Sequence, residues 1–77
     1  QGPLGSHDAG AGTMTILGVT VVPGPNAEFH NAAGNASSRE AMFGNMIEGV
    51  TVMKAVGTFT GSPPVLTADT IEMEPHL

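Results

Sequence analysis

The chain has 77 residues, a formal net charge of −5 and no cysteine. A chain of this length makes one small domain, and without cysteine neither disulfides nor thiolate metal sites can staple it. Two cations against seven acidic groups disfavour nucleic acids and anionic membranes as partners. No apolar run approaches the ~20 residues that a membrane-spanning helix needs, so membrane insertion is not expected.

The core must come mainly from aliphatic side chains and methionine. The chain has three phenylalanines, five methionines, and neither tryptophan nor tyrosine. A domain of ~70 residues is at the lower end of what buries a self-sufficient core. We therefore expect modest stability, or stabilisation by a neighbouring domain or a second copy of the chain.

The first twelve residues lack the pattern of a packed domain. Residues 1–7, QGPLGSH, are typical of an expression-tag remnant, in which a protease site is followed by cloning residues. Residues 8–12, DAGAG, are small and indicate a flexible linker. The sequence therefore predicts a single folded domain over residues 13–75.

Two strand regions are expected next. Residues 13–22, TMTILGVTVV, change the parity of their apolar residues at Gly18, which indicates a bulge or a turn there. The sequence PGPN at 23–26 predicts a turn, because proline lacks an N–H donor and disfavours helix in the preceding residue. A short strand over 27–30 and a small-residue loop over 31–36 follow.

A short helix is expected after this loop. Ser37 and Glu40 have the spacing of a capping box, which predicts a helix over residues 38–43. Residues 44–45, Gly-Asn, are expected to end it with a left-handed residue. Phe43 and Ile47 are the side chains expected to anchor this helical turn to the core.

The stretch IEGVTVMKAVGTFT, residues 47–60, predicts a long strand with one buried face. Its valines have the even spacing of that face, and threonines and a phenylalanine add residue types that suit a pleated surface. Gly49 and Gly57 are positions at which such a strand can bend or bulge. A long, glycine-kinked strand is what a small and strongly curved barrel needs.

One more strand completes the chain. Residues 61–64, GSPP, connect to 65–74, VLTADTIEME, whose apolar residues change parity near Asp69 and Thr70 and so predict a bulge. This order of strands, with a short helix before the long bent strand, is that of a small OB-like Greek-key barrel, partly open and all-β apart from the helix. An SH3-like small barrel is the alternative.

With these strands the chain resembles DUF5666, a family of OB-like bacterial domains found in exported proteins. The resemblance lies in LGVTVV at 17–22, AEF at 27–29, IEGVTV at 47–52, VGTF at 56–59 and LTADTIEM at 66–73. It implies a periplasmic or secreted accessory domain, and brings no known activity or catalytic residue. The family's opening strand is absent or replaced by the first twelve residues, so an open barrel with an unpaired edge is expected.

Two sets of side chains are candidate metal ligands. Glu72, Glu74 and His76 alternate along one strand face and can present oxygen and nitrogen atoms to a divalent cation. A solvated outer face is the competing interpretation, and it is preferred. The five methionines with His7 and His30 are candidate soft ligands for Cu(I), but core filling is the usual role of methionine and is preferred.

No motif predicts catalysis. No nucleophile elbow or phosphate-binding loop is present, and ~70 residues leave little material for a cleft, so we expect neither an enzyme nor a cofactor. Nucleic-acid binding, common among OB barrels, needs a basic groove with stacking aromatic rings. The strands offer only Lys54 as a cation, and Phe29 and Phe59 are expected in the core. No nucleic-acid partner is therefore expected.

The sequence favours a non-catalytic structural or interaction module of an exported bacterial protein, acting through an exposed strand edge or one barrel face. The expected partner is a protein, either a neighbouring domain or a second copy in a homo-oligomer. The alternative is a periplasmic domain that binds a small ligand or a divalent metal. The candidate residues of the interaction edge are Val19, Val21, Val22, Val65 and Thr67.

Overall fold

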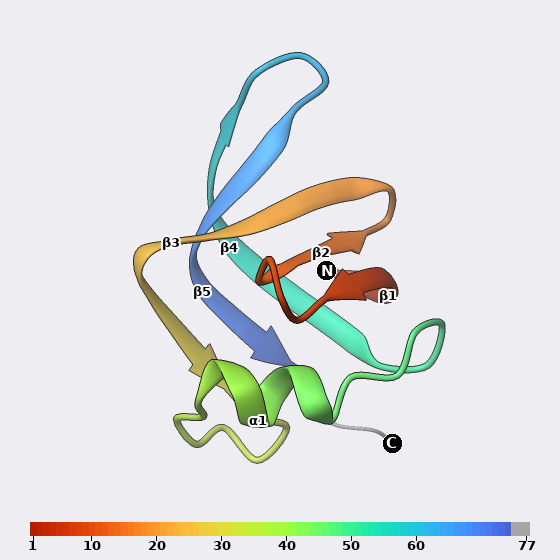
Figure 1. Cartoon of the computed structure of the whole chain (residues 1–77), viewed down its shortest axis with the longest axis vertical. Coiled ribbons are helices and arrows are strands. Elements are labelled where there is room, and N and C mark those ends of the chain that lie inside the picture. Colours follow the sequence, from red (N-terminus) through yellow and green to blue (C-terminus); the bar gives the residue numbers. More distant parts are fainter. Residues whose placement is uncertain (75–77) are drawn as a thin grey trace.

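The computed structural model describes residues 1–74 and contains five strands and one short helix. The strands form a closed barrel in the order β1-β2-β3-β5-β4 (Figure 1). Strands β3 and β5 run parallel, and the other neighbouring pairs are antiparallel. The elements are β1 (Gly2–Asp8), β2 (Thr13–Ile16), β3 (Val19–His30), α1 (Arg39–Gly44), β4 (Val52–Thr60) and β5 (Val65–Met73).

The predicted fold class is confirmed: the chain is mostly β, with one short helix between the third and fourth strands of a small OB-like barrel. The barrel is closed instead of partly open, because β1 pairs with both β2 and β4. Pro75, the predicted last residue of the domain, lies outside the described residues.

Strand β1 comes from residues that the sequence placed outside the domain. Leu4 pairs with Ile16 of β2 and is fully buried, and Gly2 pairs with Met53 of β4. The predicted linker is the turn between β1 and β2, closed by a hydrogen bond from the Gly12 N–H to the Asp8 carbonyl. The folded domain therefore includes β1 and does not start at residue 13. Leu4 is the large apolar residue that β1 adds to the core.

Strands β2 and β3 are joined by the two residues Leu17 and Gly18, which have φ angles of 51° and 77°. Positive φ at both central positions is the geometry of a type I′ turn, whose twist matches that of the paired strands. The turn predicted at Gly18 is confirmed. It puts Met14 and Val21, which pair in register, on the buried face of the hairpin.

Strand β3 is continuous through residues 23–26, where a turn between two strands was predicted. The β3–β5 register is interrupted between Pro23 and Glu28, and β3 bends sharply along its length (Figure 1). Proline has no N–H to give to a ladder but fits extended backbone, so these residues interrupt the pairing without ending the strand.

Helix α1 begins one residue later than the capping-box spacing predicts. The Ser38 hydroxyl, and not that of Ser37, accepts the hydrogen bond from the Ala41 N–H. The predicted left-handed end is wrong, since Asn45 has a φ of −105° and its side-chain amide donates to the Ala41 carbonyl. The amide thus satisfies a terminal carbonyl, which is the role otherwise filled by a left-handed cap.

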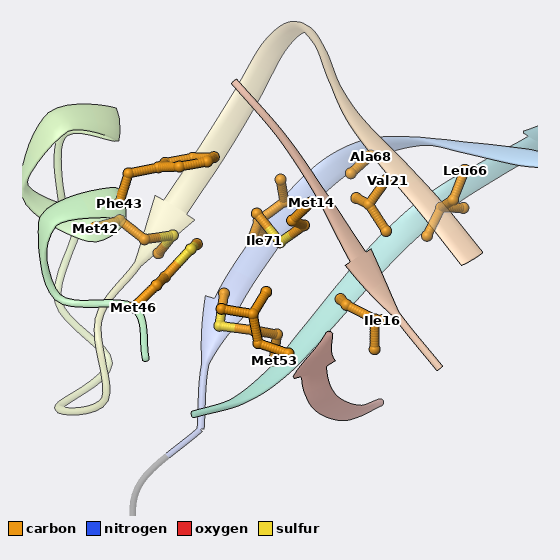
Figure 2. Packing of buried hydrophobic residues seen from close by; sticks show 11 residues of the cluster. Met14, Ile16, Val21, Met42, Phe43, Met46, Met53, Leu66, Ala68 and Ile71 are labelled. Atoms are coloured by element: carbon orange, nitrogen blue, oxygen red, sulfur yellow. The ribbon is translucent and has the colours of Figure 1, made fainter. Parts of the chain in front are cut away.

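Helix α1 closes one end of the barrel with the side chains of Met42 and Phe43, and Met46, two residues beyond the helix, joins them in the core (Figure 2). The anchor predicted at Phe43 is confirmed, whereas Ile47 is exposed. Because Met46 lies one turn after Met42, it shares the buried face, and Ile47 lies beyond it. The core-filling role of methionine is confirmed for Met14, Met42, Met46 and Met53, which are all buried.

Strand β4 is shorter than predicted, because residues 47–51 form a turn. The Val50 and Thr51 N–H groups both donate to the Ile47 carbonyl, and these bonds cannot form in an extended strand. The bulge predicted in the last strand is confirmed: Val56 pairs with Thr70 and Gly57 with Ala68, so Asp69 is the extra residue. The inner face of β5 therefore changes parity there.

At this bulge, β4 and β5 approach so closely that only glycine fits at position 57. A Cβ atom there would lie 2.7 Å from the Ala68 Cα and closer still to the Thr67 carbonyl oxygen. Gly57→Ala is expected to lower the free energy of unfolding by at least about 2 kcal/mol, because the backbones must separate. Urea unfolding followed by circular dichroism measures the loss.

Gly44→Ala is the matched control, because a Cβ at this helical position meets nothing within 4 Å. It should be neutral, or stabilising by up to about 1 kcal/mol, because alanine favours helix. Equal stabilities of the two variants would contradict the close approach at Gly57.

The turn between β2 and β3 provides a second test. Leu17 adopts a left-handed conformation that costs a non-glycine residue roughly 1–2 kcal/mol, and its side chain is mostly exposed. Asn-Gly is the preferred pair for this turn type, so Leu17→Asn is expected to stabilise the fold by about 1 kcal/mol. A lower melting temperature for this variant would show that contacts of the leucine side chain outweigh the backbone strain.

Candidate functional site

An apolar groove lies at the end of the barrel opposite α1, where the β4–β5 hairpin projects past the other strands (Figure 1). Its volume is about 470 Å³. The β2–β3 turn forms one wall, and residues 55–59 of β4 form the other. Val21 and Leu66 belong to the buried core, so the floor of the groove is continuous with it. Figure 2 shows Leu66 and Ile16 at the end of the core that is remote from α1.

Strand β1 borders the groove where it pairs with the beginning of β4. In the part of the chain that the structure describes, β1 pairs with β4 at Val52 and Met53. Strand β4 pairs with β5 along the rest of its length, from Met53 to Thr60.

The exposed side chains around the groove are apolar. Leu17, Val56 and Phe59 are 67%, 52% and 60% exposed, although each is a large hydrophobic residue. Phe59 pairs in register with the buried Leu66, so the hairpin carries an apolar cross-strand pair beyond the end of the barrel. The expected burial of Phe59 is therefore wrong, because the strands that would cover it end too early. No lining residue of the groove has a charged side chain.

The structure does not give a free edge to the residues predicted to form one. Val22 pairs with Thr67, and Val65 pairs with Thr20, within the parallel β3–β5 ladder. The other side of β3 is covered by β2 as far as Val21. The expected interaction edge is therefore wrong for these residues, because each of them has a partner in a ladder. Val19 and Val21 nevertheless line the groove, through their side chains and not through an open ladder.

The candidate metal ligands are only partly brought together. His30, Glu72 and Glu74 border one shallow hollow of about 210 Å³, while His76 lies outside the described residues. Glu72 also lies opposite Lys54 in the β4–β5 ladder. Among residues 1–74, no three His, Asp or Glu side chains are placed to hold a metal ion.

Comparisons with family models, curated proteins and solved structures find no match for this chain. Within residues 1–74, no helix is both long and apolar enough to cross a membrane.

The groove predicts different consequences for two apolar residues that face each other across the hairpin. Phe59→Ser should change the free energy of unfolding by less than about 1 kcal/mol, because the ring is mostly solvated. Leu66→Ala should cost about 2–5 kcal/mol, since Leu66 is only 7% exposed. Thermal unfolding of both variants compares the losses. An equal loss at the two positions would mean that the groove is filled in solution.

Proposed function

We propose that this chain is a non-catalytic interaction module, which binds a segment of another protein in the apolar groove beside β4. The observation that carries the proposal is the group of exposed apolar side chains, Leu17, Val56 and Phe59, around a groove whose floor reaches the core. Covering apolar surface releases roughly 25 cal/mol per Å², and contiguous exposed patches mark interaction sites.

The composition of the groove supports a role in binding and not in catalysis. General acid–base and nucleophilic chemistry need ionisable or nucleophilic side chains at the reacting atoms. The side chains that line the groove are aliphatic or aromatic, apart from those of Gly57 and Gln1, and none of them is acidic, basic or nucleophilic.

The positions of the two cations support a protein partner over a nucleic acid. Arg39 donates to the carbonyls of Ala9 and Gly10 at 3.0 and 3.2 Å, where it holds the β1–β2 turn. Lys54 lies on β4, opposite Glu72 of β5. The two side chains thus serve different elements, and a net charge of −5 repels a polyanion.

Placement of this module in an exported bacterial protein rests on the resemblance of its strands to the DUF5666 family. The lack of cysteine is compatible with an oxidising compartment. The bound segment can come from a second copy of the chain, and the complex is then a homo-oligomer.

Selection from a random peptide display library tests the proposed function. Peptides selected on the immobilised chain are expected to lose binding to the double variant Val56→Lys, Phe59→Ser, which places a charge and a hydroxyl on the groove wall. Ile47→Ser is the matched control, because Ile47 is 59% exposed but lies outside the groove. Peptides that bind the double variant equally well, or no selected peptide at all, would overturn the proposal.

Thermal unfolding of the same chain tests the alternative of a metal-binding domain. The melting temperature is expected to be unchanged by Zn²⁺, Cu²⁺ or EDTA, because no three His, Asp or Glu side chains among residues 1–74 are placed to hold a metal ion. A metal-dependent rise that disappears in Glu72→Gln would favour the alternative, since binding to the native state raises stability by mass action.

A further inference from the structure

We propose that Met73 is an oxidation site, at which a hydroperoxide converts the thioether into a sulfoxide and thereby loosens helix α1. The site lies at the α1 end of the barrel, away from the apolar groove, so the inference is independent of the proposed function. Oxidation makes a flexible apolar side chain polar, and reductases reverse the change, so a methionine can act as a switch.

Met73 is the most exposed of the five methionines. Met14, Met42, Met46 and Met53 are buried, with exposed fractions of 6% or less, whereas Met73 at the end of β5 is only partly buried. Its side chain packs against the core cluster on one side. Because an oxidant must reach the sulfur atom, Met73 is the methionine most open to reaction.

Met73 lines a hollow of about 320 Å³ whose other walls are helix α1 and the loop that precedes it. Met42 of α1 lines the same hollow. Met73 also borders the adjoining hollow of about 210 Å³, beside His30. A water molecule takes about 30 Å³ of liquid volume, so a hydroperoxide has room next to the Met73 side chain. The hollow therefore gives an oxidant access to a sulfur atom that is in contact with the core.

The reaction transfers one oxygen atom to the Sδ atom of Met73. A sulfur lone pair attacks the terminal oxygen of the hydroperoxide, so that an S–O bond forms while the O–O bond breaks. The sulfur loses two electrons, and the oxidant gains them. The proton of the transferred oxygen passes to the leaving oxygen, which departs as water when the oxidant is hydrogen peroxide.

The sulfoxide changes the surface on which helix α1 packs. The helix has six residues, and isolated helices shorter than about 12 residues are marginal in water, so the packing of Met42 and Phe43 holds α1 in place. A polar S=O group beside Met42 must keep its contact with water, because a buried polar group without a hydrogen bond is unfavourable. Hydration of the sulfoxide therefore opens the hollow and weakens the packing of α1.

Mass spectrometry after treatment with hydrogen peroxide tests the site. The folded chain is exposed for increasing times, and the oxidised fraction of each methionine is read from its proteolytic peptides. Met73 is expected to oxidise at least tenfold faster than each of the four buried methionines. Equal rates at Met73 and at a buried methionine overturn the site.

The effect on helix α1 is measured on the chain oxidised at Met73. Its melting temperature is expected to fall by at least about 4 °C. The Met42 and Asn45 amide protons, which donate to the Ser38 and Met42 carbonyls, should exchange with solvent at least tenfold faster. Treatment with the two methionine sulfoxide reductases, one for each epimer, should restore both properties. An unchanged melting temperature and unchanged exchange overturn the loosening of α1.

Met73→Leu should abolish the response to peroxide, because leucine has a similar volume and no sulfur. Met53→Leu is the matched control: Met53 pairs with Met73 in the β4–β5 ladder but is fully buried, so this variant should respond as the unchanged chain does. Circular dichroism of each variant confirms that the fold is retained. A response that persists in Met73→Leu overturns the proposal. If a variant fails to fold, the oxidation rates and amide exchange of the unchanged chain decide the question.

Discussion

The architecture depends on the close approach of β4 to β5 at Gly57. Asp69 is the extra residue of β5 at this point, and the two strands come together so tightly that a side chain on residue 57 has no room. Bulges increase the local twist of a strand pair. The β4–β5 pair extends from the end of the barrel near α1 to the tip of the projecting hairpin (Figure 1). It therefore both curves the sheet into a barrel and places Phe59 beyond the reach of the covering strands.

The two ends of the barrel are finished in different ways. At one end α1 inserts flexible methionine side chains and Phe43, which compensate for the scarcity of aromatic residues (Figure 2). The other end has no such plug, and the core reaches the surface there through Val21 and Leu66. The exposed apolar area therefore lies at the end that the helix does not cover, because one short helix can cover only one end of a small barrel.

Local patterns predicted the strands and their irregularities, whereas long-range pairing could not be derived from them. The parity change at Asp69 and the glycine at position 18 were sufficient to place a bulge and a turn. Leu4 gave no periodic signal, so the strand that closes the barrel was missed. The interaction edge was misplaced for the same reason, because Val22 and Val65 have partners in the parallel β3–β5 ladder and no local residue pattern encodes that pairing.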